Sequence, residues 1–178
     1  MVTLETERLR LRMFRENDLE AYARICADPG VMQYLGEGKP LTRPEAWRQM
    51  AMIIGHWHLR GYGLWAVEER ATCALVGRIG LFNPEGWAGL ECGWMLARPY
   101  WGKGYATEGA LASVAHGFGE LGLEQVISLI DPRNTASVRV AQRLDMTRDR
   151  DRIHPVTRVR LAVYVKNAED AGSQRQAS

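Results

Sequence analysis

The residues best suited to chemistry lie in one stretch, where Gly102-Lys103-Gly104 directly precedes a run with helical spacing. Glycines let an anionic group approach the backbone, because they lack a side chain and tolerate left-handed angles. The first N–H groups of a helix have no partner within it and lie at the positive end of the helix dipole. We therefore expect this stretch to bind a phosphorylated ligand.

The two common nucleotide-binding motifs do not fit this stretch. A Walker-type loop requires Ser or Thr after Gly-Lys, and Gly104 stands there instead. A dinucleotide fingerprint requires a third Gly or an Ala where this chain has Thr107. The phosphorylated ligand is therefore expected to belong to another class.

A longer pattern surrounds these glycines. Residues 91–96 read Glu-Cys-Gly-Trp-Met-Leu, and residues 100–108 read Tyr-Trp-Gly-Lys-Gly-Tyr-Ala-Thr-Glu. The pattern resembles the acetyl-CoA loop of the GNAT acetyltransferases, most closely the RimJ/RimL-like branch that acetylates ribosomal-protein N-termini. Further matches at residues 61–67, 76–81 and 134–139 extend the resemblance over most of the chain. It implies a GNAT-type fold, acetyl-CoA as co-substrate without a metal, and a primary amine as acceptor.

The resemblance also implies which residues bind the cofactor. They are Trp94, Met95, Leu96, Trp101, Gly102, Lys103, Gly104, Tyr105, Ala106, Thr107, Asn134 and Ser137. Backbone N–H groups from Gly102 to Thr107 would hold the pyrophosphate, with positive charge from Lys103 or Arg98. The main chain of Leu96 would bind the pantetheine and polarise the thioester carbonyl, as donors aimed at a developing oxyanion do.

Glu91 and Ser137 are the expected catalytic residues. A protonated amine has no lone pair, so Glu91 is expected to accept its proton, directly or through water. By the resemblance, Asn134 would hold the pantetheine or the neighbouring strand, and Ser137 would donate a proton to the departing thiolate. Three alternatives remain open: Glu91 in a structural hydrogen bond or salt bridge, Asn134 as the N-cap of the following helix, and water in place of Ser137 as the proton donor.

The composition is that of an ordinary globular protein. The 178 residues are 46% hydrophobic and 25% charged, with a formal net charge of +2, so neither nucleic acid nor a membrane surface is an expected partner. Three cysteines without metal-type spacing and an N-terminus unlike a signal peptide predict a reducing, cytoplasmic location. The oligomeric state is not readable, and a homodimer is one option.

Apolar periodicity and turn residues predict one α/β domain over residues 1–166 and a disordered tail over residues 167–178. Predicted strands span residues 9–13, 64–68, 74–81, 90–96, 125–130, 147–153 and 158–165. Predicted helices begin after Asp18, Thr42, Gly104 and Thr135. The resemblance implies a mixed, mostly antiparallel twisted sheet of about six to seven strands with about four flanking helices. It also implies that strands 90–96 and 125–130 splay apart to admit the pantetheine arm.

Three details of the sequence make local predictions. Thr42 and Glu45 form a capping box, and Gly61 ends the helix that the box begins. One face of that helix is expected to carry Trp47, Met50, Ile54 and Trp57. Asp145 stands where relatives in the family usually have Gly, and it is expected to keep the left-handed turn.

The acceptor amine is not specified by any motif. A protein N-terminus is the first choice because of the branch that the chain resembles, and a small amine is the second. A non-catalytic acyl-CoA-binding sensor is the alternative of a different class. The alternating Arg and Asp residues over 148–152 are expected to form a solvated face.

Overall fold

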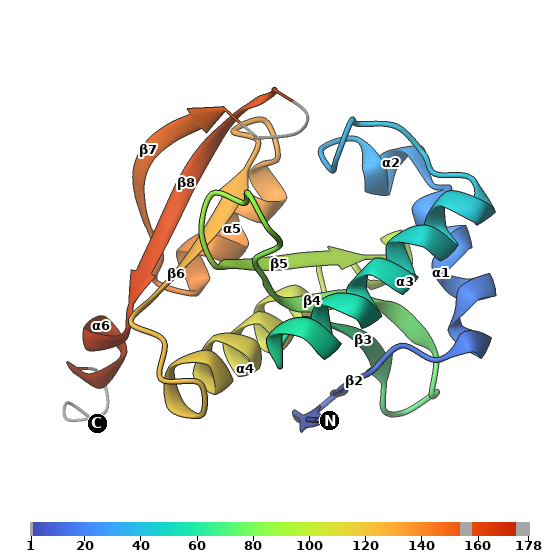
Figure 1. Cartoon of the computed structure of the whole chain (residues 1–178), viewed down its shortest axis with the longest axis horizontal. Helices are drawn as coiled ribbons and strands as arrows, with labels where there is room; N and C mark the ends of the chain where they lie inside the picture. Colours follow the sequence, from blue (N-terminus) through green and yellow to red (C-terminus); the bar gives the residue numbers. More distant parts are fainter. Residues whose placement is uncertain (1, 154–157, 174–178) are drawn as a thin grey trace.

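The computed structural model describes residues 2–153 and 158–173. Within these ranges the chain forms one open, mixed sheet of eight strands in the order β1-β2-β3-β4-β5-β6-β8-β7 (Figure 1). The strands are β1 (Leu4–Glu5), β2 (Leu9–Arg12), β3 (Leu64–Glu69), β4 (Leu75–Phe82), β5 (Glu91–Leu96), β6 (Gln125–Ile130), β7 (Thr147–Ile153) and β8 (Arg160–Asn167). Every neighbouring pair is antiparallel except β5 with β6. The mixed, mostly antiparallel sheet is confirmed, with slightly more strands than expected.

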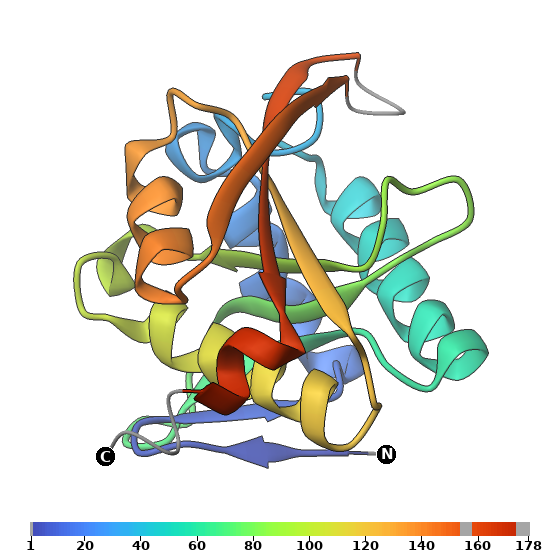
Figure 2. The same ribbon diagram turned by 90° about the vertical axis from the view of Figure 1, so that its left-hand side faces the viewer.

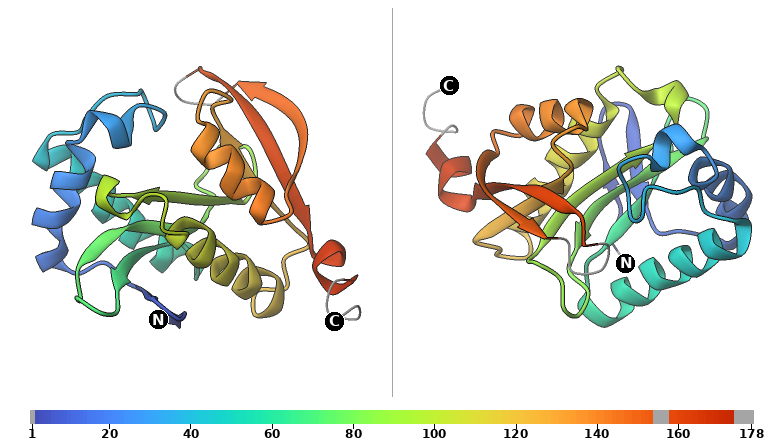
Figure 3. Two further views of the ribbon diagram at one scale, coloured as in Figure 1. Left: turned by 180° about the vertical axis from the view of Figure 1, so that it is seen from behind. Right: turned by 90° about the horizontal axis from the view of Figure 1, so that it is seen from above.

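Six helices flank the sheet in the described ranges. They are α1 (Leu19–Cys26), α2 (Pro29–Met32), α3 (Arg43–Arg60), α4 (Tyr105–Gly119), α5 (Thr135–Arg143) and α6 (Ala168–Ser173). Seen from above, α1, α2 and α3 cover one face of the sheet, while α4 and α5 cover the other (Figure 3). In the part of the chain described, no helix is long and apolar enough to cross a membrane.

The predicted helix caps explain where α3 begins and ends. Thr42 accepts a bond from the backbone of Glu45, and its own N–H donates to the Glu45 carboxylate over 2.7 Å. Gly61 ends the helix with a left-handed φ of 76°. Asp145 likewise adopts a φ of 55° after α5, so the expected left-handed turn is kept without glycine.

The buried face of α3 differs from the prediction. Met50 and Trp57 are buried as expected, but Trp47 and Ile54 are 52% and 38% exposed. The helix instead buries Ala46 and Ile53, which with Met50 and Trp57 follow the spacing i, i+4, i+7 and i+11. Apolar residues occur on both faces of α3, and contact with the sheet selects one of them.

The end of the chain also differs from the prediction over part of its length. β8 continues to Asn167, and α6 occupies residues 168–173, a segment expected to be disordered (Figure 2). The Ala168 N–H donates to the Glu124 carbonyl over 2.9 Å, which ties the start of α6 to the loop before β6. Residues 174–178 of the predicted tail lie outside the described residues.

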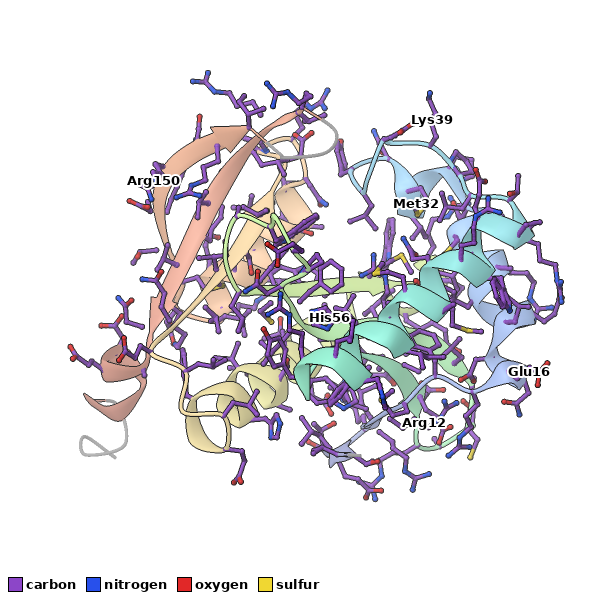
Figure 4. The ribbon with its side chains drawn as sticks, viewed as in Figure 1. Arg12, Glu16, Met32, Lys39, His56 and Arg150 are labelled. Atoms are coloured by element: carbon purple, nitrogen blue, oxygen red, sulfur yellow. The ribbon has the colours of Figure 1, made fainter. Side chains whose placement is uncertain are left out.

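A buried ion cluster joins the first strands to α1. The Arg12 guanidinium donates to Asp18 over 2.8 Å and to Glu68 over 2.7 Å, and these three side chains are at most 7% exposed. Arg12 is labelled in Figure 4. The hydrogen bonds that Arg12 donates to Asp18 are the main reason that the pKa of Arg12 is raised, and burial opposes them. β2, β3 and the start of α1 are thereby held in fixed register.

Replacing Arg12 with Met should destabilise the protein by about 3–5 kcal/mol, because two buried carboxylates lose their cation. Arg10→Met is the matched control on the same strand, since Arg10 also contacts Glu68 but its side chain is 40% exposed. Urea unfolding of both variants measures the difference. Equal losses in the two variants would contradict a special role for the buried cluster.

Candidate active site

The central feature of the site is an opening between β5 and β6. β4 pairs with β5 along its whole length, from Gly77–Leu96 to Phe82–Glu91. β5 and β6 share a single pair, Glu91 with Ile127. The strands therefore separate toward the carboxyl end of β5 (Figure 1), which confirms the splay that the family resemblance implied.

The hydrogen bonds at the ends of β5 fix which main-chain groups face this opening. Ala97 donates to Val76 of β4, while Leu90 accepts from Ile127 of β6. Hydrogen-bonding directions alternate along a strand, so the main chains of residues 92, 94 and 96 are directed toward β6. At residue 92 the Ser128 hydroxyl closes the gap by donating to the Cys92 carbonyl over 2.7 Å. Trp94 and Leu96 therefore present their main chains to the opening.

Trp94, Met95 and Leu96, the predicted pantetheine-binding residues of β5, differ in whether their main-chain groups face the opening. The Leu96 carbonyl accepts a 2.7 Å hydrogen bond from the indole of Trp101, so Trp101 braces the end of the strand. Met95 is buried in the core, and by the same alternation its main chain is directed toward β4. The main chain of Trp94 and the N–H of Leu96 are the parts of this set best placed for a ligand.

The glycine stretch forms a cradle at the start of α4. Gly102 and Gly104 have φ values of 74° and 84°, and Gly104 is the N-cap of the helix. The helix begins at Tyr105, so the N–H groups of its first turn have no acceptor within the helix. A Cβ on Gly104 would lie 3.4 Å from the Arg8 guanidinium. Both glycines are therefore required by the backbone conformation.

Arg8 supplies positive charge at this cradle and was missed from the sequence. Its guanidinium donates to the Lys103 carbonyl over 2.8 Å, pairs with Glu108 over 2.6 Å, and lies over the ring of Tyr105. Arg8 is 95 residues from Lys103 in sequence, and no motif connects them.

The two cations proposed from the sequence have different surroundings. The Lys103 ammonium lies 5.2 Å from the centre of the Tyr100 ring, beside the cradle. Arg98 donates to Asp28 over 2.7 Å and so serves to join the loop to α2. In the described part of the chain no carboxylate forms an ion pair with Lys103, whereas Glu108 partly compensates the charge of Arg8. Lys103 is thus the cation best placed to face an anion, with Arg8 beside it.

The first turn of α4 contains two different kinds of side chain. Tyr105 is buried, its hydroxyl donates to Glu69 over 2.7 Å, and its ring stacks on Tyr100, so its side chain anchors the cradle. Ala106 is half-buried. The Thr107 hydroxyl is buried and lacks a hydrogen-bond partner among the described residues. A cradle with free N–H groups, nearby cations and an unpartnered hydroxyl fits a pyrophosphate.

Ser137, Asn134 and Trp94 meet on the far side of the opening. The Trp94 indole N–H donates to the Ser137 hydroxyl over 3.1 Å, and the Ser137 N–H donates to the Asn134 side chain over 3.1 Å. Asn134 is therefore the N-cap of α5, which confirms that alternative. The cap places Ser137 on the first turn of α5, next to β5.

Glu91 lies where β5 and β6 still touch. Its carboxylate accepts a 2.7 Å hydrogen bond from the Trp87 indole. Glu91 therefore makes the structural hydrogen bond that the sequence analysis gave as an alternative. Burial raises the pKa of Glu91, while the Trp87 hydrogen bond, the Leu129 main chain and the charge of Arg78 partly oppose this effect. A raised pKa brings the carboxyl group closer to the range that suits a general base near neutral pH.

A cleft of about 690 Å³ connects these groups. Its lining includes Glu91, Trp94, Asn134 and Ser137, together with the loop after α2 that carries Lys39. Figure 4 shows Lys39 at the outer end of that loop and Met32 below it. The predicted site residues thus form two groups, one in the cleft and one at the cradle, joined by β5.

Comparison with known proteins defines the class of this site. Residues 8–147 match the family model described as the Acetyltransferase (GNAT) domain. The chain therefore belongs to the GNAT acetyltransferase family, and it is an acetyltransferase.

Individual relatives agree with this assignment. YkkB of Bacillus subtilis, an uncharacterized protein, is 35% identical over 151 residues, which cover 80% of this chain and 84% of YkkB. The crystal structure of an acetyltransferase from Agrobacterium tumefaciens has a TM-score of 0.82 at 31% identity, covering 94% of this chain and 95% of that one. RimL, a ribosomal L7/L12 α-N-protein acetyltransferase in complex with coenzyme A, has a TM-score of 0.76 over 93% of this chain and 98% of its own. Its 16% identity makes this last likeness one of fold.

The raised pKa of Glu91 predicts a stability change in Glu91→Gln. The folded state binds the proton more tightly than the unfolded state, so the contribution of Glu91 to stability is lost as pH rises through its folded pKa. The variant should therefore be more stable than wild type at pH 8, and the difference should vanish as pH falls and Glu91 becomes protonated. Glu85→Gln, at a 98% exposed side chain, is the control. Urea unfolding at several pH values measures this, and a destabilised variant at pH 8 would contradict it.

Proposed function

We propose that this protein is an acetyl-CoA-dependent N-acetyltransferase that transfers an acetyl group to a primary amine by direct attack in a ternary complex. The observation that carries the proposal is the opening between β5 and β6, which lies between the cradle and the Glu91 cleft. We place the activity in the cytoplasm, in keeping with the three free cysteines Cys26, Cys73 and Cys92.

Acetyl-CoA would be held by three parts of the chain. The N–H groups from Gly102 to Thr107 face the pyrophosphate, with Arg8 and Lys103 adding charge. The Trp94 carbonyl and the Leu96 N–H would replace part of the missing β6 ladder with bonds to the pantetheine amides. When bound, acetyl-CoA supplies the thioester that the amine attacks.

Glu91 and Ser137 would each take part in one proton transfer, Glu91 with the amine and Ser137 with the sulfur. Glu91 accepts the proton of the ammonium, directly or through water, which leaves the amine neutral and nucleophilic. The Ser137 hydroxyl accepts from the Trp94 indole, so its own hydrogen is free to be donated to the departing sulfur. The nitrogen loses a second proton as the amide forms, and this proton replaces the one that Ser137 gives to the thiolate. The net reaction therefore releases the single proton that Glu91 accepts.

The donor to the developing oxyanion is assigned to Trp94 in preference to Leu96. Leu96 is five residues from Glu91, about 17 Å along a strand, whereas Trp94 is three residues away, about 10 Å. The shorter separation suits a base and an oxyanion donor that act on one reacting centre, and such a donor is worth about 3 kcal/mol. Leu96 is left to bind the pantetheine.

A protein N-terminus and a small amine are both acceptors of the proposed class. The alternative function, a non-catalytic acyl-CoA sensor, would need the cradle but no proton acceptor in the cleft. Glu91, with its raised pKa and its place in the cleft lining, favours the enzyme. Release of free CoA thiol in the presence of an amine distinguishes the two functions.

Acetyl-CoA at one hundred times its Kd should stabilise the fold by about 2.7 kcal/mol, since it binds only the folded state. NAD and ATP should stabilise it much less.

Gly104→Val should weaken CoA binding steeply, because a β-branched residue resists a φ of 84° and adds bulk at the cradle. Thermal shift and calorimetric titration measure both effects. A folded Gly104→Val variant with wild-type affinity would place the cradle elsewhere.

Glu91→Gln should lower turnover near neutral pH by about 10²-fold or more, the usual scale for loss of a general base. Raising the pH should restore part of the activity, because more of the amine is then neutral without help. Ser137→Ala should lose less and show little rescue by alkali, since it affects departure of the sulfur. The measurement is initial rate against pH, with CoA affinity determined separately. Full activity of Glu91→Gln at every pH would make Glu91 structural.

A further inference from the structure

Arg78 is a cation in the cleft to which the proposed mechanism gives no role. It lies on β4, where it pairs with Met95, while Phe82 pairs with Glu91. Side chains of directly paired residues, and of residues two apart on one strand, share a face of the sheet. Arg78 and Glu91 therefore extend from the same face, and both line the cleft.

The guanidinium of Arg78 lacks an anionic partner. Its Nε is buried without a hydrogen-bond partner, and within residues 2–153 and 158–173 no carboxylate forms an ion pair with it. The guanidinium has a neutral polar neighbour in the Tyr22 hydroxyl, which donates its own hydrogen to Gln49 over 2.6 Å. Burial raises the pKa of Tyr22, so this neighbour carries no negative charge. Arg78 itself is half-buried and lines the cleft. A charge that is partly removed from water without an anionic partner costs folding free energy, and an anionic ligand would offset that cost.

A gap separates Arg78 from Glu91. The pair between them is Gly80 with Gly93. A Cβ on Gly80 would meet the Gly63 carbonyl oxygen, so the open space lies at Gly93, which lines the cleft. A Cβ placed on Gly93 would lie 3.8 Å from the Glu91 Oε1, so the carboxylate leans over this gap. The charge of Arg78 influences Glu91, yet the two do not form an ion pair. The cleft thus offers an anion and a cation on either side of an open space.

The walls beside this gap are apolar. Leu64 Cδ2 lies 3.9 Å from the same Cβ position on Gly93. Phe82 and Trp87 meet edge to face with their ring centres 5.4 Å apart, and Ile53 of α3 also lines the cleft. These surfaces suit an apolar side chain next to the charged groups.

We propose that the acceptor is a primary amine that carries a carboxylate, of the class of an amino acid with an apolar side chain. Arg78 binds the carboxylate, and the amine lies toward Glu91. This inference rests on the proposed acetyltransferase function and specifies the substrate of the same site. A guanidinium suits the carboxylate because its planar fork can donate two parallel hydrogen bonds.

The test compares acids with their neutral counterparts. Thiol release from acetyl-CoA is measured with leucine, methionine and phenylalanine, with their carboxamides, and with short peptide amides whose second residue is neutral or acidic. Rates are divided by the fraction of neutral amine at the assay pH, because amides and acids differ in amine pKa. Wild type should show kcat/KM higher for the acids by about tenfold to a hundredfold, the scale of a charge-assisted hydrogen bond.

Variants link this preference to Arg78. Arg78→Met keeps an apolar stem and should bring the acid-to-amide ratio close to one by raising KM for the acids, while activity on the amides is retained. Arg78→Lys should keep part of the preference. Lys39→Met, at the rim of the cleft with a 78% exposed side chain, removes one positive charge and should leave the ratio unchanged.

The outcomes separate this inference from the proposed function. Acetylation of acids and amides at equal rates by wild type would overturn the inference and leave the acetyltransferase assignment standing. A preference that survives Arg78→Met would also overturn it. A preference for acidic peptides over free amino acids would support the carboxylate and assign it to a peptide side chain. CoA binding without acetylation of any amine would refute the proposed enzyme, and this inference with it.

Discussion

The single pair of residues shared by β5 and β6 is the constraint on which the site depends. Buried main-chain N–H and C=O groups need partners, and a sheet normally supplies them from the next strand. Here β6 turns away to pair fully with β8, and the Ser128 hydroxyl satisfies only the first carbonyl beyond the contact. The main chain of Trp94 is left for a ligand that can bind as a strand does.

Two arginines on the same sheet differ in whether a protein carboxylate compensates their charge. Arg12 has two carboxylates within 2.8 Å that compensate its charge, so it stabilises the junction of β2, β3 and α1. Arg78 lies two strands away, and its buried Nε has no hydrogen-bond partner. The residue type is identical, and the difference lies in where the compensating negative charge comes from.

Sequence patterns predicted the features that depend on local chemistry. The capping box at Thr42, the left-handed Gly61 and Asp145, and the glycine N-cap of α4 all follow from the conformations that these residues prefer. The splay of β5 from β6 was available only through resemblance to a family, because no periodicity encodes the separation of two strands. The architecture and the cradle were therefore predictable.

Features that depend on contacts between distant segments were not predictable. Arg8 reaches Lys103 across 95 residues, and the isolation of Arg78 becomes visible only when every neighbouring carboxylate is located. The buried face of α3 was misassigned because apolar residues lie on two faces, and packing against the sheet decides between them. Asn134 was predictable in one respect and not in another. Its capping role follows from the sequence, whereas its place beside Ser137 required the fold.

The two border strands of the sheet differ from the strands at its inner opening in how they expose backbone hydrogen-bonding groups. β1 has two residues, and all seven residues of β7 are exposed, with Arg and Asp alternating over 148–152. Short or charged borders discourage a second chain from adding a strand. The two borders of the sheet therefore disfavour strand addition, and the unpaired main chain of β5 lies between strands in its interior. We expect resistance to aggregation and recognition of a ligand to depend on the same property, which is where the sheet leaves backbone hydrogen bonds unmade.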